Sequence, residues 1–190
     1  NPLQILLAIK KNIDTTRLIE ERTTKNYQQD FRNISMKLSS LTNIDEWYLL
    51  FKKLTYWELE IGNSGEQGME QILEMQKSEA NSQFFKFVRD NYKNWLQVEE
   101  SPLMSHNLIK NKVLEHLSEE RPTYFILIDN LRYDQWKIIE PLVLQDFKLI
   151  NDDMYTSILP TATQYSRNSI FAGLLPLEIQ NKYPDLWKND

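Results

Sequence analysis

The stretch Thr123-Tyr-Phe-Ile-Leu-Ile-Asp-Asn130 decides the fold class of the second half of the chain. It is a continuous apolar run of strand length, and the lack of alternation favours a strand that is covered on both faces, as in a parallel α/β sheet. We expect a helix at about 132–145, strands at 147–150 and 154–159, and a helix from Thr161 or Thr163 that Gly173 ends. This order is typical of the start of an α/β domain, and residues 121–190 are too few to complete one.

The residues before Pro122 have a different character. Only Pro2 and Pro102 occur in the first 120 residues, whereas five prolines follow, so a domain boundary is predicted near residue 120. The periodicity of apolar residues predicts helices at 1–12, 14–41, 43–62, 66–97 and 106–118. Their wide, aromatic stripes are typical of a bundle that buries its own core at 13–120. Aromatic-rich helices also build dimer interfaces, which is the alternative.

The composition excludes several classes of protein. The 190 residues contain no Cys and two His, which excludes disulfide scaffolds, Cys-ligated zinc and thiol catalysis. A net charge of -5 argues against general DNA binding. The sequence has no run of about 18 apolar residues, so no membrane insertion is predicted. His106 and His116 have no partner at ligand spacing, so they are predicted to be surface residues.

Asp129 is the first residue that packing explains poorly. It follows a wholly apolar run, at the strand end where ligands bind in open α/β sheets. Its other possible role is to cap the next helix through the Asp129-Asn130 turn. The sequence leaves both roles open.

The second such feature is Leu159-Pro-Thr-Ala-Thr-Gln-Tyr165, a strand end, a proline and two hydroxyls at a helix start. A Thr there is commonly a cap, but a helix N-terminus also attracts anions, so the hydroxyl could attack a phosphoryl group. A neutral hydroxyl is a weak nucleophile, and no Cys or nearby His can activate it. A metal held by Asp129 is the predicted activator. Arg167, one turn further along, could reach the same phosphate or be solvated.

Residues 125–136 together with 159–176 resemble the PglZ domain of the alkaline phosphatase superfamily, through the strand-end Asp, Pro-Thr-Ala-Thr and Gly-Leu-Leu-Pro. The resemblance implies that Asp129 binds one of two zinc ions and that Thr163 is the metal-bound nucleophile, with Thr161 the second candidate. Arg167 and Asn130 are weaker candidates for contacts to the substrate phosphate. The implied fold is an α-helical bundle followed by the N-terminal part of an α/β alkaline-phosphatase-like domain.

The chain as a whole resembles PorX-type response regulators. Asn1-Pro-Leu-Gln-Ile-Leu-Leu-Ala-Ile-Lys-Lys11 is similar to the last helix of a receiver domain, so residues 1–12 are assigned to a receiver end or linker helix. The resemblance implies a cytoplasmic protein whose output domain hydrolyses phosphodiester bonds in nucleotide substrates. It also implies control of protein secretion, a sensor kinase partner and homodimers.

The pattern also departs from the superfamily, whose remaining Asp and His ligands come far downstream of the nucleophile. Residues 164–190 contain no His, and Asp152 and Asp153 are expected to be solvated turn residues. We therefore expect a truncated site that is inactive in this chain even if the parent protein is a hydrolase. Two alternatives stay open: a partner-binding module with an inert phosphatase-like scaffold, and an unrelated α/β start with two capped helices.

Overall fold

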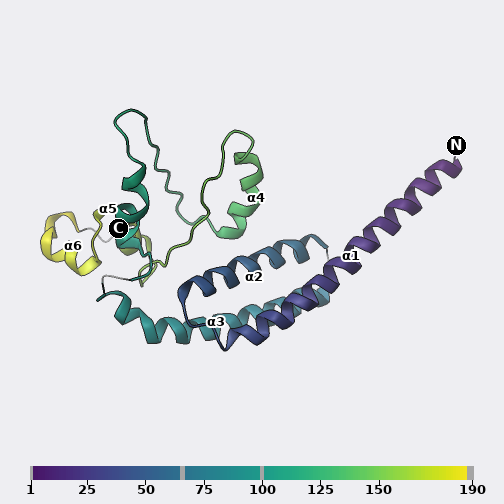
Figure 1. Cartoon of the computed structure of the whole chain (residues 1–190), viewed down its shortest axis with the longest axis horizontal. Coiled ribbons are helices and arrows are strands. Elements are labelled where there is room, and N and C mark those ends of the chain that lie inside the picture. Colours follow the sequence, from purple (N-terminus) through teal and green to yellow (C-terminus); the bar gives the residue numbers. More distant parts are fainter. Residues whose placement is uncertain (1, 65–66, 99–100, 188–190) are drawn as a thin grey trace. The chain divides into compact units, whose positions relative to one another are not determined.

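The computed structural model describes residues 2–64, 67–98 and 101–187. The chain divides into two compact units, Asn1–Asn91 and Tyr92–Asp190, which are described separately. Figure 1 shows the three long helices and the shorter elements that follow them. None of the helices in the described ranges is both long and apolar enough to cross a membrane.

The first unit is built from three helices: α1 (Pro2–Leu38), α2 (Ile44–Ser64) and α3 (Gln67–Trp95), the last of which continues into the second unit. Its core is aromatic, as the stripes predict. The Tyr27 and Trp57 rings lie 5.2 Å apart, and Trp47 packs against Phe84 and Phe87. The buried cluster comprises Tyr27, Ile34, Leu38, Trp47, Leu54, Trp57, Ile61, Met69, Leu73 and Ala80. Burial of this apolar surface is what holds the three helices together.

The prediction of two separate helices at 1–12 and 14–41 is wrong, because α1 is continuous from Pro2 to Leu38. The Thr15 hydroxyl donates a 2.8 Å hydrogen bond to the carbonyl oxygen of Lys11, four residues back. This bond lets a threonine stay inside a helix instead of capping a new one. Residues 3–38 also contain no Gly or Pro that would stop the helix.

The predicted start of α2 at Asn43–Glu46 is confirmed. Oδ1 of Asn43 accepts the Glu46 N–H at 3.0 Å, and Oε2 of Glu46 accepts the N–H groups of Thr42 and Asn43. These backbone donors lower the pKa of Glu46. The reciprocal bonds satisfy helix-end N–H groups that would otherwise lack partners.

The second unit contains short helices and long extended segments. After three short turns at Ser105–Asn107, Ile109–Val113 and Leu114–His116 come α4 (Tyr133–Val143), α5 (Thr163–Ala172), α6 (Pro176–Lys182) and a final turn, Pro184–Leu186. The predicted helices at 132–145 and up to Ala172 are confirmed. Gly173 ends α5 with φ 63°, the left-handed conformation that glycine adopts at helix ends.

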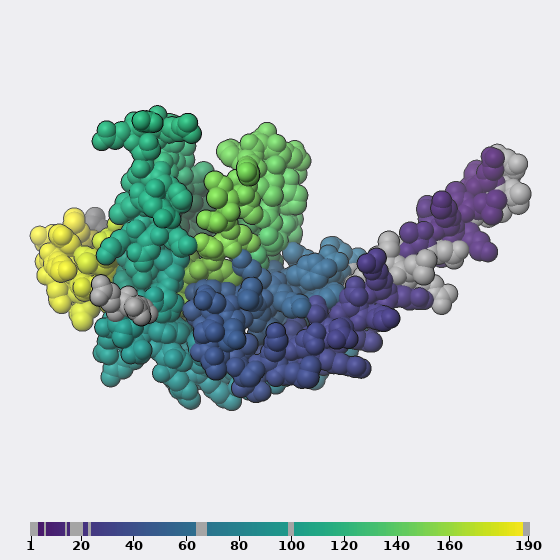
Figure 2. Space-filling model, in the orientation of Figure 1, coloured from purple at the N-terminus to yellow at the C-terminus, as the bar shows by residue number. Residues whose placement is uncertain are grey.

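The predicted strands at 123–128, 147–150 and 154–159 are not formed in the described part of the chain. Its one β-bridge joins Met104 to Thr156 in parallel, with the Thr156 N–H bonded to the Leu103 carbonyl at 2.8 Å. A parallel strand requires a hydrogen-bonded neighbour, and the apolar run has none here. Residues 121–130 are accordingly exposed, and the teal-green part of the chain stands at the surface in Figure 2. The predicted α/β architecture is therefore not realised as a sheet.

Candidate functional site

The two residues singled out for chemistry lie together in the second unit. Oγ1 of Thr163 donates a hydrogen bond of 3.3 Å to Oδ2 of Asp129, across 34 positions of the chain. Asp129 is exposed and Thr163 is half-buried, so solvent and ligands can reach the pair. A hydroxyl and a carboxylate in this contact give the threonine oxygen a fixed orientation.

Asp129 does not cap the helix that follows it. The residue at the N-cap of α4 is Arg132, whose backbone N–H donates to Oε1 of Gln135 at 3.0 Å. The Arg132 side chain is paired with Asp134, and this hydrogen-bonded pairing lowers the pKa of Asp134. Residues after Asp129 therefore form the start of α4, and Asp129 is not needed as a cap. The Asp129 carboxylate is bonded to Thr163 instead.

Thr163 is not a cap either. It is the first residue of α5, whose N-cap is Ala162 and carries no side-chain cap bond. The N–H groups of Tyr165 and Ser166 both donate to the Ala162 carbonyl at 3.0 Å. Those of Thr163 and Gln164 are left as the donors that the helix end offers to an anion.

The other predicted residues take separate places. Thr161 is exposed, and Asp129 bonds to Thr163 rather than to it. Asn130 has φ 59°, a left-handed conformation in which Asn is enriched, so it turns the chain directly after Asp129. Arg167 lines a hollow of about 590 Å³ between α5 and α6, and neither Thr163 nor Asp129 contributes to that lining. The structure therefore unites Asp129 and Thr163 but does not add Arg167 to them.

Asp153 is exposed, as predicted, whereas the side chain of Asp152 is only 27 % exposed. Oδ2 of Asp152 accepts the Tyr133 hydroxyl at 3.1 Å and lies 3.6 Å from Nζ of Lys137. Asp153 pairs with Lys112 at 2.7 Å. Burial is the largest cause raising the pKa of Tyr133, and its bond to Asp152 adds to it. These contacts tie the turn to α4 and to the segment around Lys112.

The donor set near Thr163 is short of what a zinc ion needs. Asp129 and Thr163 supply two oxygen atoms, whereas zinc sites in proteins take three or four protein ligands. Within the ranges that the structure describes, no group of three or more His, Cys, Asp or Glu residues could hold a metal. The pair fits one edge of a metal site and does not complete it.

The sequence did not single out the residues that hold the Thr163 turn in place. Oγ of Ser166 lies 2.7 Å from Oγ of Ser157 and 3.1 Å from Oγ of Ser105. The Tyr92 hydroxyl accepts the Leu159 N–H at 2.6 Å. Serines are common in any sequence, so their presence alone indicates nothing. Only Ser166 could have been identified from the sequence, because it lies one turn after Thr163 on the same helix.

Comparison with known families divides the chain in the same order. Residues 17–96 match the PorX response regulator linker domain, and residues 108–190 match the BREX system PglZ alkaline phosphatase-like domain. No curated protein matches the chain. The first match covers most of the three-helix unit, and the second contains both Asp129 and Thr163.

The predicted domain limits near residues 12 and 120 stay predictions. The two matches, to a PorX response regulator linker domain and then to a PglZ alkaline phosphatase-like domain, agree with the PorX-type response regulator architecture that the sequence predicts.

Proposed function

We propose that the PglZ-like part of this chain carries the nucleophile of a metal-dependent phosphodiesterase, and that it acts as the output of a response regulator. The observation that carries the proposal is the Thr163–Asp129 hydrogen bond, made by two residues that the structure frees from capping. Zinc, when bound, would supply charge that lowers the pKa of the attacking oxygen, with Asp129 and Thr163 as two of its ligands. We expect two zinc ions in a complete site.

The chain's own residues define the direction of the reaction. The Thr163 hydroxyl points its proton at Oδ2 of Asp129, which leaves an oxygen lone pair for the phosphorus atom. Attack would form an Oγ1–P bond and break the bond from phosphorus to the leaving alcohol, which takes up the proton that Thr163 gives up through Asp129. Water would then break the Oγ1–P bond of the threonyl phosphodiester, which releases a phosphomonoester and restores the Thr163 hydroxyl. The free N–H groups of Thr163 and Gln164 are placed to stabilise a phosphoryl oxygen.

Hydrolysis of bis(p-nitrophenyl) phosphate by the full-length protein, with added zinc, tests the proposal. We expect Thr163→Ala to lower kcat/KM by at least about 100-fold, because it removes the attacking atom. Asp129→Asn should lower both kcat/KM and zinc affinity in a calorimetric titration. Thr161→Ala is the matched control and should keep near wild-type activity. Full activity in Thr163→Ala, or none in the wild type with zinc, would contradict the proposal.

The wider role follows from the response regulator architecture. We propose a nucleotide as the physiological substrate, a sensor kinase as the upstream partner, a link to protein secretion and a cytoplasmic location. We propose Arg167 and Asn130 as weaker candidates for contacts to the substrate phosphate; Arg167 lines the α5–α6 hollow.

A second candidate function, docking of a partner or of a second copy, is favoured by a groove on the three-helix unit. The groove between α1 and α3 has a volume of about 790 Å³, and its lining includes Tyr27, Ile72, Met75 and Gln76. Ile72 and Met75, which α3 contributes to the lining, are 45 % and 74 % exposed. A partner that covers them would bury apolar surface, which favours association.

Sedimentation velocity over a range of concentrations tests this second candidate as a homodimer. Met75→Glu places a charge in the groove and should shift the protein to monomers. Leu49→Glu is the control, because Leu49 is similarly exposed on α2 and does not line the groove. A wild-type protein that stays monomeric at all concentrations, or equal effects of both variants, would rule out a dimer through this groove.

A further inference from the structure

A chain of three serine hydroxyls closes the base of the turn that presents Thr163. Ser105 and Ser166 are 0 % and 8 % exposed, and Ser157 is half-buried. They come from three separate parts of the second unit: the turn at Ser105–Asn107, the extended segment before Pro160, and α5. A buried polar group is costly unless it is hydrogen-bonded, so the mutual pairing of the three hydroxyls is a strong local constraint.

One end of this hydroxyl series is fixed by the backbone. The Ile158 N–H donates to Oγ of Ser105 at 3.1 Å, so Ser105 is tied to the segment before Pro160. Oγ of Ser166 lies 3.1 Å from Oγ of Ser105 and 2.7 Å from Oγ of Ser157, and either member of each pair can be the donor. In both directions Ser166 is hydrogen-bonded to both of the other serines.

The hydrogen bonds between the three serines bridge the segment that contains Thr163. Ser157 and Ser166 lie at the two ends of residues 157–166, and their 2.7 Å contact closes this segment. Because α5 has no side-chain cap at Ala162, its first turn is held by what it packs against. Ser166 lies three residues after Thr163 and so faces the same side of the helix.

We propose that Ser166, held between Ser105 and Ser157, is a positioning residue that fixes the Thr163 side chain toward Asp129. The inference rests on the proposed function for its consequence in catalysis, but the geometry itself can be tested without activity. Ser166 does not contact the reacting atoms, and it acts by setting the rotation of the first turn of α5.

Ser169 provides a matched control on the same helix. It is 0 % exposed, one turn beyond Ser166, and its hydroxyl has no hydrogen-bond partner within the described residues. Ser166→Ala and Ser169→Ala therefore remove the same atom at similar burial from the same helix. Only the first substitution breaks the chain of serines.

The experiment measures the χ1 angle of Thr163 in the protein from three-bond couplings to its methyl carbon, by NMR with threonine methyl labelling. We expect one rotamer in the wild type and in Ser169→Ala, and averaging over rotamers in Ser166→Ala. Ser157→Ala breaks the same chain at its more exposed end, so it should give the same averaging even if Ser166→Ala does not fold. Wild-type couplings in a folded Ser166→Ala or Ser157→Ala, or equal averaging in Ser169→Ala, would overturn the proposal.

Kinetics separate this inference from the proposed function. With bis(p-nitrophenyl) phosphate, Ser166→Ala should lower kcat by about tenfold with KM within about twofold of wild type, because misplacement of a reacting group acts on the chemical step. If the Thr163 couplings change but Thr163→Ala keeps its activity, the phosphodiesterase proposal fails and the positioning role stands. If Thr163→Ala is inactive but the couplings of both serine variants match wild type, the positioning role fails alone.

Discussion

Oγ1 of Thr163, the first residue of α5, is hydrogen-bonded to Oδ2 of Asp129 at 3.3 Å, although 34 positions separate the two residues. Asp129 precedes α4 and Thr163 begins α5, and the sequence offers each of them a role as a cap. In the structure α4 and α5 begin without either side chain as a cap. The contact between them therefore needs a reason other than helix formation, and the phosphodiesterase proposal supplies one.

Two glycines should respond in opposite ways to replacement by alanine. Gly173→Ala should lower the free energy of unfolding by about 1 kcal/mol, because φ at this position is 63°. Space does not cause this cost, since an added Cβ would lie 3.7 Å from the His106 carbonyl oxygen, an ordinary contact. Gly62→Ala should instead raise the free energy of unfolding by about 0.5 kcal/mol, since Gly62 is in α2 with open space around it. Urea denaturation measures both, and a stabilising Gly173→Ala would be inconsistent with the left-handed helix end.

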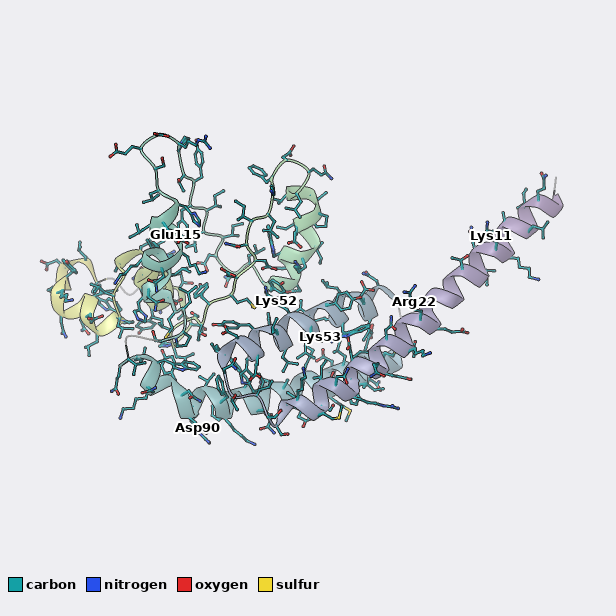
Figure 3. The ribbon with its side chains drawn as sticks, in the orientation of Figure 1. Lys11, Arg22, Lys52, Lys53, Asp90 and Glu115 are labelled. Carbon is teal, nitrogen blue, oxygen red and sulfur yellow. The ribbon has the colours of Figure 1, made fainter. Side chains whose placement is uncertain are left out.

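The Asp30 carboxylate should contribute more to the stability of the helical unit than Lys53, its ion-pair partner. Oδ1 of Asp30 pairs with Nζ of Lys53 at 2.7 Å, and Oδ2 accepts the indole N–H of Trp57 at 3.1 Å. Lys53, labelled in Figure 3, has a side chain that is 43 % exposed. Lys53→Ala should therefore cost at most about 1 kcal/mol. Asp30→Ala should cost about 2 kcal/mol, because Trp57 is 3 % exposed and would lose its charged acceptor.

Denaturation of the two variants at low and high salt checks this order. The Lys53→Ala effect should shrink with added salt, since it is a surface ion pair. The Asp30→Ala effect should persist through its contact to Trp57. Equal losses in both variants would show that the ion pair, and not the indole bond, is the main contribution.

Tyr27 should make the protein less stable at alkaline pH. Burial raises its pKa from 10.0 to about 12. In the unfolded state the phenol loses its proton first, so the Tyr27 contribution is fully present below pH 10 and is lost as the pH rises from 10 to 12. Tyr27→Phe should flatten the decrease over this range. At pH 7 it should leave stability unchanged or raise it, because the hydroxyl is buried without a partner within the described residues.

Tyr92→Phe is the contrasting variant for this prediction. The Tyr92 hydroxyl accepts the Leu159 N–H at 2.6 Å, so its removal should cost about 1 kcal/mol at pH 7. Denaturation at a series of pH values compares the two. An unchanged alkaline decrease in Tyr27→Phe would contradict a raised pKa for this residue.

Local signals were sufficient to predict several element boundaries. Asn43 and Glu46 lie at the spacing of a reciprocal helix start, and their side chains bond as the spacing requires. Gly173 was predicted to end a helix because it can adopt positive φ, and it does. Such features depend on residues a few positions apart, so the sequence alone contains what determines them.

Features that depend on distant residues were predicted less well. Asp14, Thr15 and Thr16 form a good cap sequence, but the helix around them continues, and no local rule distinguishes a capping threonine from one that bonds back to Lys11. The apolar run 123–128 has strand composition, yet strand pairing also requires a neighbour. Asp152 and Asp153 lie in a segment without regular secondary structure, and only the fold brings Tyr133, Lys137 and Lys112 to them.

The candidate site shows the same limit. The sequence and its family resemblance indicated Asp129 and Thr163, and the structure places them in contact. Arg167, also chosen for its spacing, lines a different hollow. Ser105 and Ser157 could not be predicted, because they join the site through contacts between segments up to 61 positions apart.

The most direct test of the central claim is the capture of a covalent intermediate on Thr163. The full-length protein with zinc would be mixed with a phosphodiester substrate, quenched in acid during turnover, digested and examined by tandem mass spectrometry. We expect the mass of the transferred phosphoryl species on Thr163 in the wild type, and its absence in Asp129→Asn. Modification of Thr161 instead, or turnover in which no threonine of residues 159–165 is ever modified, would contradict it.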